Sequence, residues 1–117
     1  MGKIRKYMNK IIVYFGEQDI FSETLKKMVQ IEGSQLFDFL NWKDCGEQFS
    51  DINPSFVFLD YDSSKLDEFP TEVKSKECVV FSTHDLNELD WNNKYYVHKK
   101  PLEVLQFREF LQDLLAK

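Results

Sequence analysis

The chain alternates short apolar runs with segments whose apolar residues recur at helical spacing. The apolar runs contain β-branched or aromatic residues and lie at 10–15, 34–40, 55–60, 77–82 and 94–99, with Asp38 as a polar exception in the second. Continuous apolar runs of this length are typical of strands that are buried on both faces of a parallel sheet. We therefore expect five strands, each separated from the next by a helix or a loop.

Two segments carry a clear helical periodicity. Residues 19–32 place apolar side chains such as Leu25 and Met28 at helical spacing. Gly33 follows this segment and is a typical helix end. Residues 102–115 carry the broadest apolar stripe in the chain. The other helical segments are short or interrupted, and they lie at 43–51, 65–76 and 84–91.

Strands that alternate with helices in one small chain predict an α/β fold with a parallel sheet. We expect a flavodoxin-like, doubly wound five-stranded sheet with a shortened third helix at 65–76 and a shortened fourth helix at 84–91. Residues 1–9 are expected to form a basic N-terminal tail, and residues 10–117 a single domain. Ligand chemistry in such a fold lies at the carboxyl ends of the strands.

The charge balance narrows the range of partners. The 117 residues include 15 Lys and Arg against 20 Asp and Glu, a net charge of −5. Because binding to phosphate backbones needs a basic face, we expect no nucleic-acid partner. The apolar run that follows the basic N-terminal residues stops at Gly16, which is too early for a signal peptide or a membrane span. We therefore expect a cytoplasmic protein with no membrane contact.

The cysteines and histidines predict neither redox nor metal chemistry. Cys45 and Cys78 lie far apart and form no CxxC pair, which fits a reducing compartment. With His84 and His98 as the only histidines, a structural zinc site is not expected.

Three polar residues follow the ends of separate predicted strands. Asp60 ends the third apolar run, in PSFVFLDYD, and Ser82 ends the fourth, in VVFST. Lys100 follows the fifth run and precedes Pro101, in HKKP. Because the carboxyl ends of parallel strands meet at one edge, we expect these side chains to converge. No Gly-rich phosphate loop follows the first run, so nucleotide binding is not favoured.

This ordered set resembles the CheY-like receiver domain of bacterial response regulators, over roughly residues 10–115. The resemblance implies a place in two-component signal transduction, or phosphorelay. It implies that Asp60 is the phosphoacceptor position, that Ser82 contacts the phosphoryl oxygens, and that Lys100 pairs with the phosphoryl charge.

The first strand departs from the family pattern. Receivers end it with an acidic pair that holds Mg²⁺, whereas this chain has Phe15 and Gly16 there, with Glu17 as the nearest acidic substitute. Mg²⁺ requires several oxygen ligands, and Asp60 alone would hold it poorly. We therefore expect a degenerate metal site, no metal or other cofactor, no catalytic residue and no enzymatic activity, with Asp60 as a relict carboxylate.

These features predict an atypical receiver, or pseudo-receiver, that acts by protein–protein interaction in bacterial signal transduction and is not phosphorylated. Two alternatives remain open. The first is a functional stand-alone receiver that accepts a phosphoryl group on Asp60 with Mg²⁺, with Glu17 as a metal ligand. The second is an unrelated small α/β binding domain.

The resemblance also implies where a partner binds. The partner face in the family corresponds to the predicted fourth helix, fifth strand and last helix. The candidate residues on this face are Trp91, Tyr95, Leu105 and Phe110. The expected partner is another protein or a second copy of the chain, and ordinary core packing is the alternative reading of each residue.

Overall fold

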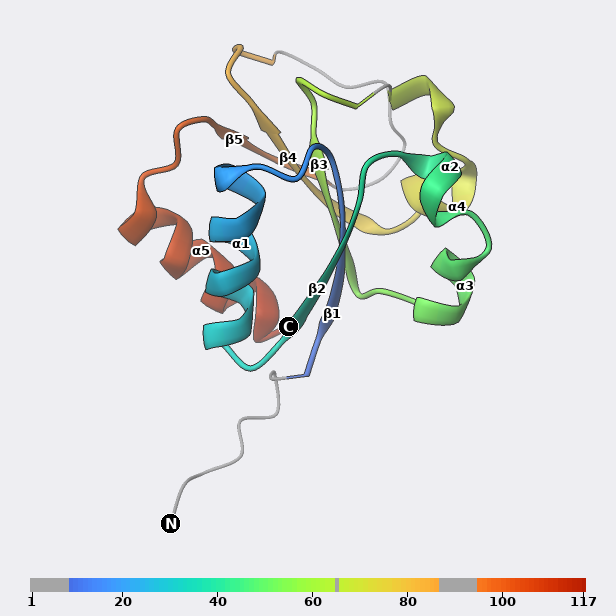
Figure 1. Cartoon of the computed structure of the whole chain (residues 1–117). Helices are drawn as coiled ribbons and strands as arrows, with labels where there is room; N and C mark the ends of the chain where they lie inside the picture. Colours follow the sequence, from blue (N-terminus) through green and yellow to red (C-terminus); the bar gives the residue numbers. More distant parts are fainter. Residues whose placement is uncertain (1–8, 65, 87–94) are drawn as a thin grey trace.

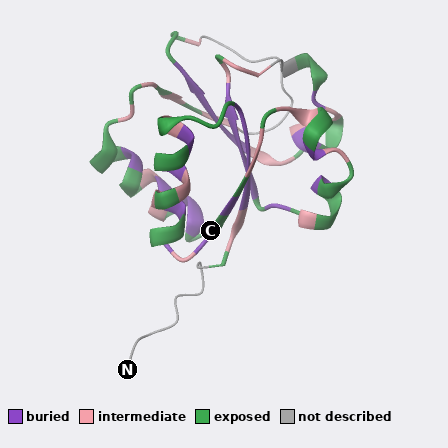
Figure 2. Ribbon diagram, in the orientation of Figure 1, coloured by how far each residue is buried: buried purple, intermediate pink, exposed green. Residues whose placement is uncertain are grey.

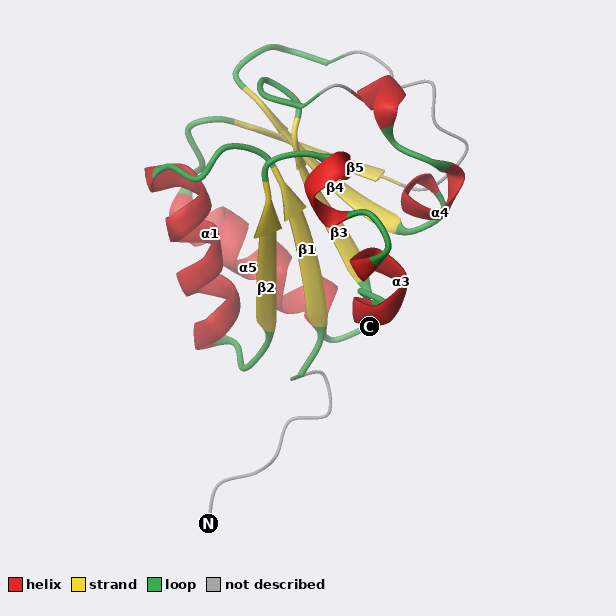
Figure 3. Cartoon of the chain, turned by 45° about the vertical axis from the view of Figure 1, so that its right-hand side comes forward, coloured by secondary structure: helices red, strands yellow, loops and turns green. Residues whose placement is uncertain are grey.

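A five-stranded parallel sheet forms the centre of the molecule. The computed structural model describes residues 9–64, 66–86 and 95–117. The strands are β1 (Ile11–Phe15), β2 (Gln35–Phe39), β3 (Phe56–Asp60), β4 (Glu77–Ser82) and β5 (Tyr95–Lys99). They lie in the order β2-β1-β3-β4-β5, with every pair parallel. Figure 3 shows them running in one direction. The predicted flavodoxin-like sheet is therefore confirmed.

The helices cover both faces of the sheet, as Figure 1 shows. One face is covered by α1 (Ile20–Ile31) and α5 (Val104–Leu115). The other face is covered by three shorter helices and a 3₁₀ turn, which are α2 (Trp42–Cys45), α3 (Gln48–Ile52), η1 (Leu66–Glu68) and α4 (Thr71–Lys74). None of the helices in the described segments is long and apolar enough to cross a membrane.

Alternation along the strands divides the core into two layers. Tyr14 and Phe58 point to the α1 and α5 side, where they pack with Phe107. Phe15 and Leu59 point to the opposite side, among the residues of the short helices. All five residues of β3 are buried, which agrees with its position in the middle of the sheet. Figure 2 shows this burial along the central strands.

One of the predicted helices differs from expectation, and another is confirmed as short. The segment 43–51 is not one helix, because Gly46 has a positive φ of 50° and ends α2 before α3 begins. The shortened helix expected at 65–76 is confirmed, because Pro70 precedes α4 and cannot continue a helix from η1. Both interruptions shorten the layer that covers this face of the sheet.

Two predicted features fall largely outside the described residues. Of the helix expected at 84–91, residues 84–86 are described and are not helical. The rest of that segment, with Trp91, lies outside the described residues, as does the expected tail up to residue 8.

The long helices begin and end close to prediction, and Asp19 caps α1 through a reciprocal pair of hydrogen bonds with Ser22.

Candidate functional site

Two of the three predicted site residues meet at the carboxyl edge of the sheet. Asp60 is the last residue of β3, and Lys100 follows β5 directly. The Lys100 Nζ donates to Asp60 Oδ1 at 2.8 Å. Ser82 ends β4 between these strands, and its hydroxyl donates to Asp62 rather than to Asp60. The three residues therefore share one site, in which Asp62 connects Ser82 to the other two.

Both oxygens of the Asp60 carboxylate are engaged by protein groups. Asp60 is only 3 % exposed. Its Oδ1 accepts from Lys100 and from the Asp62 N–H, the latter at 3.2 Å. Its Oδ2 accepts from the Ser63 hydroxyl at 2.8 Å. A buried carboxylate needs such partners because desolvation alone would be costly.

Asp62 is the central residue that sequence reasoning missed. Its Oδ1 accepts from the Ser82 hydroxyl at 2.9 Å. Its Oδ2 accepts from the Thr83 N–H at 2.9 Å and lies 3.2 Å from the Lys100 Nζ. The sequence signal was an acidic residue two positions after Asp60 in the loop at the strand end. Nothing in that spacing identifies which groups its carboxylate contacts.

The contacts of the site shift the pKa values of Lys100 and Asp62 in opposite directions. Burial alone would lower the pKa of Lys100, but the hydrogen bonds and charges of Asp60 and Asp62 outweigh it and raise that pKa above its usual value. Burial likewise favours the neutral form of Asp62. The hydrogen bonds from Thr83, Ser82 and Lys100 nevertheless lower the pKa of Asp62 below its usual value. The cluster thus contains two carboxylates for one ammonium group.

The positions that would hold Mg²⁺ in a receiver do not fit that ion here. The Phe15 side chain is fully buried and packs on Phe69, with ring centroids 4.8 Å apart. A Cβ on Gly16 would lie 2.7 Å from both Asp60 Cβ and Tyr14 Oη, so no acidic side chain fits at this position. Glu17 is exposed, beyond the end of β1. Within the described ranges, no three His, Cys, Asp or Glu residues are grouped to hold a metal ion.

Tyr14 occupies the space beside Gly16. Its side chain is fully buried, and its hydroxyl has no hydrogen-bond partner among the residues that the structure describes. Burial raises the pKa of Tyr14 well above its usual value, and the nearby negative charge of Asp60 raises it further. A neutral phenol therefore lies next to the candidate acceptor, where a receiver has acidic side chains.

The partner-face candidates differ in exposure. Leu105 is 67 % exposed on α5. Phe110 is half-buried. The centroid of its ring lies 4.3 Å from the ring centroid of His98 and 5.1 Å from that of Tyr96. Tyr95 is half-buried against the core on the side of the short helices. Trp91 lies outside the described residues. The interaction role of these four residues stays a prediction.

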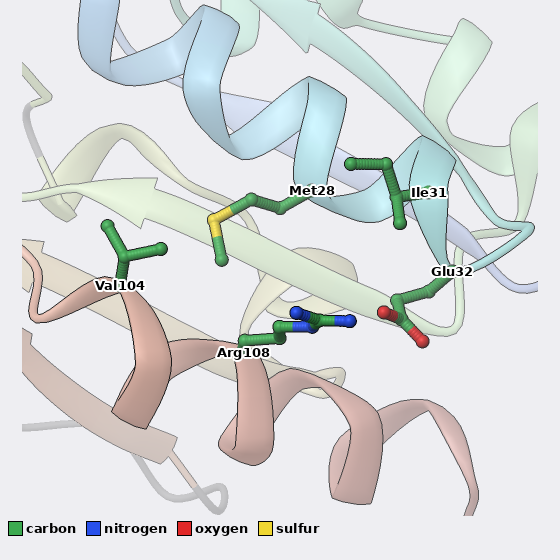
Figure 4. Close-up of a pocket in the computed structure, with 5 residues that line it drawn as sticks. All are labelled: Met28, Ile31, Glu32, Val104 and Arg108. Carbon is green, nitrogen blue, oxygen red and sulfur yellow. The ribbon is translucent and has the colours of Figure 1, made fainter.

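A groove between α1 and α5 was not predicted from the sequence. It has a volume of about 220 Å³ and is lined by Met28, Ile31, Glu32, Val104 and Arg108. Figure 4 shows the Arg108 side chain reaching from α5 toward the Glu32 carboxylate at the end of α1. Glu32 is buried, and its Oε2 accepts from Gln112 at 3.2 Å. Its Oε1 has no hydrogen-bond partner among the described residues.

Comparisons with known proteins identify the fold. No protein-family model matches the chain, and no curated protein matches its sequence. Among solved structures, the pseudo-receiver domain of the CikA protein matches with a TM-score of 0.66 and 12 % identity, over 90 % of this chain and 96 % of that chain. A response regulator receiver domain protein from Bacillus halodurans matches with a TM-score of 0.72 and 11 % identity, over 92 % and 97 % of the two chains.

A third solved structure, a CheY-like receiver domain from Methylobacillus flagellatus, is 21 % identical with a TM-score of 0.62, over 91 % of this chain and 98 % of that chain. The three matches cover nearly the whole of each domain. The chain therefore has the fold that receiver and pseudo-receiver domains share.

Proposed function

We propose that this chain is a pseudo-receiver, a signalling domain that acts by binding other proteins and is not switched by phosphorylation of Asp60. The observation that carries the proposal is the geometry at Gly16. A side chain at this position would collide with Asp60 and Tyr14, so the acidic ligand of a receiver has no room. The buried phenyl ring of Phe15 fills the preceding position.

The chemistry of phosphoryl transfer explains why this geometry matters. Transfer to a carboxylate develops negative charge that a divalent cation neutralises in proteins of this kind. The positive group at Asp60 is Lys100, which is already shared with Asp62. A phosphoryl donor that approached Asp60 would therefore meet the uncompensated charge of a second carboxylate.

The intact contact between Asp60 and Lys100 favours the rival function, a working receiver. In that function, Glu17 would have to supply the missing metal ligand. The exposed position of Glu17 after β1 gives this role no support. The same contact has a structural explanation, because an ion pair stabilises a carboxylate that is almost fully buried.

Intact-mass measurement tests the proposal. The protein is incubated with Mg²⁺ and acetyl phosphate, beside a receiver that is known to accept the phosphoryl group under the same conditions. We expect the mass of this chain to stay unchanged while the reference receiver gains a phosphoryl group. A mass gain that disappears in Asp60→Asn would overturn the proposal and establish a working receiver.

A further inference from the structure

We propose that the Asp62 carboxylate is the resident ligand of an oxyanion site formed by the Ser82 hydroxyl, the Thr83 N–H and the Lys100 ammonium group. This inference deepens the proposed function and rests on it, because it explains what occupies the site when no phosphoryl group is present. Removal of the Asp62 carboxylate would then create a binding site for a free oxyanion such as inorganic phosphate.

The three donors converge on one carboxylate from two strand ends. Ser82 and Thr83 lie at the end of β4, and Lys100 follows β5. Their donor atoms lie at 2.9, 2.9 and 3.2 Å from the Asp62 oxygens. A hydroxyl, a backbone N–H and a cation together suit an anion with several acceptor oxygens. Asp62 supplies two such oxygens from within the chain.

The fold positions these donors without the help of Asp62. The Lys100 N–H donates to the Ser82 carbonyl at 2.8 Å, which fixes the ends of the two strands side by side. The His84 N–H donates to the Ser82 Oγ at 3.0 Å, which leaves the hydroxyl proton free to point toward Asp62. The Lys100 Nζ is also held by Asp60 and lies 4.9 Å from the centre of the Phe21 ring. We therefore expect the donor set to persist when Asp62 is replaced.

The contacts of Asp62 overlap with those that the resemblance implies for a phosphoryl group. Ser82 and Lys100 are the residues that the receiver pattern assigns to the phosphoryl oxygens and charge. An internal carboxylate has a high effective concentration at such a site, and it repels a dianion that approaches from solution. The wild-type site is thus kept filled and does not respond to phosphate or phosphoryl donors.

Phosphate titration followed by NMR tests this assignment. In Asp62→Ala, we expect added inorganic phosphate to shift the Thr83 amide resonance saturably, with an affinity at least roughly tenfold above that of wild type. The same shift should be lost in the double variant Asp62→Ala with Lys100→Ala. Asp113→Ala is the matched control, because it removes an exposed acidic charge on α5 and should leave phosphate affinity at the wild-type level.

The assignment is wrong if folded Asp62→Ala binds phosphate no better than wild type. A second measurement needs no variant and covers the case in which Asp62→Ala fails to fold. In the wild-type protein, the Thr83 amide resonance should follow the titration of the Asp62 carboxyl group. A Thr83 amide resonance whose chemical shift does not change as Asp62 titrates would also overturn the assignment. Neither measurement reports whether Asp60 accepts a phosphoryl group, which the intact-mass measurement tests, so a failure here is distinguishable from a failure of the proposed function.

Discussion

Lys100 shows how one side chain can serve a structural purpose at a position that suggests phosphoryl chemistry. Its ammonium group contacts Asp60 and Asp62, and its side chain is only 14 % exposed. The Asp60 side chain is 4 % exposed, so its negative charge has little access to water. Removing one partner of such a buried ion pair lowers stability far more than removing one partner of an exposed pair. The reason is that the remaining charge stays buried without a counter-charge.

We therefore predict that Lys100→Met lowers the free energy of unfolding by about 3 kcal/mol, because it leaves Asp60 without its counter-charge. Lys99→Met is the matched control. Lys99 pairs with Asp85 at 2.9 Å, but the two side chains are 62 % and 84 % exposed. Loss of this exposed pair should change stability by less than about 0.5 kcal/mol. Urea denaturation measures both, and equal effects would contradict the account.

Tyr14 supports a second prediction at the scale of one residue. Its buried hydroxyl has no partner in the described chain, so Tyr14→Phe removes a polar group without breaking a bond. We expect unchanged stability or a gain of up to about 1 kcal/mol. Tyr96→Phe is the contrasting variant, because the Tyr96 hydroxyl donates to Glu77 and accepts from Lys117. Thermal unfolding should show a loss for Tyr96→Phe, and a comparable loss for Tyr14→Phe would refute the prediction.

At the scale of the element, strand β5 and helix α5 form an aromatic layer at one side of the sheet. The ring centroid of His98, on β5, lies 5.0 Å from that of Phe107 and 4.3 Å from that of Phe110. Phe110 therefore contributes to packing, which the sequence left open as the alternative to a partner contact. Leu105, five positions earlier on the helix, is exposed.

This difference predicts opposite stability effects along α5. Phe110→Ala should lower the free energy of unfolding by about 2–3 kcal/mol, because it removes contacts with two rings of β5 at a half-buried position. Leu105→Ser should change it by less than about 0.5 kcal/mol. Chemical denaturation measures both changes. A large loss for Leu105→Ser would show that this residue packs inside the molecule and is not available to a partner.

The environment of His98 predicts a pH dependence. Burial lowers the pKa of His98 below its usual value of about 6.5. The unfolded chain then binds a proton more readily than the folded chain, so stability rises with pH through this window. As pH falls from about 6.5 through the folded-state pKa, this residue should reduce the free energy of unfolding.

The His98→Leu variant isolates this contribution. We expect its free energy of unfolding to vary less than that of wild type between about pH 7 and pH 5.5. Denaturation curves across this range measure the difference between the two proteins. If the free energy of unfolding varied equally with pH in wild type and His98→Leu, the result would contradict the buried environment of His98.

Sequence pattern predicts local elements better than it predicts the contacts between them. The five strands follow from apolar runs such as 55–60, of which Phe56–Asp60 form β3 and are buried in the middle of the sheet. The pattern does not predict the division of 43–51, because it does not show that Gly46 takes a positive φ and ends the first helix. The helical periodicity of 102–115 survives in α5 because its apolar stripe packs on the sheet.

The site shows the same limit. The sequence predicts the meeting of Asp60 and Lys100 because Asp60 ends one recognisable strand, Lys100 follows another, and parallel strand ends converge. Asp62 belongs to a loop, where its carboxylate could take many directions. Its contact with Ser82 joins residues from different strands and depends on the assembled sheet. The space beside Gly16 is likewise set by Asp60 and Tyr14, which meet it only in the folded chain.

At the scale of the whole molecule, the chain keeps the receiver fold while the polar edge of its sheet is internally satisfied. Its fold matches solved receiver and pseudo-receiver domains over nearly the whole of each domain. The Asp60 carboxylate, the Lys100 ammonium group and the Ser82 hydroxyl are all held by groups of the chain itself. This arrangement supports our proposal that the domain signals through its surface rather than through a change at Asp60.

Titration with Mg²⁺, followed by amide NMR of the wild-type protein, tests this central claim most directly. The account predicts no saturable shift at residues 60–64 or 82–84, because Phe15 and Gly16 leave no acidic pair to complete a metal site. Saturable shifts centred on Asp60 that disappear in Asp60→Asn would contradict it. They would show that the edge of the sheet still binds the cation that phosphoryl transfer in a receiver requires.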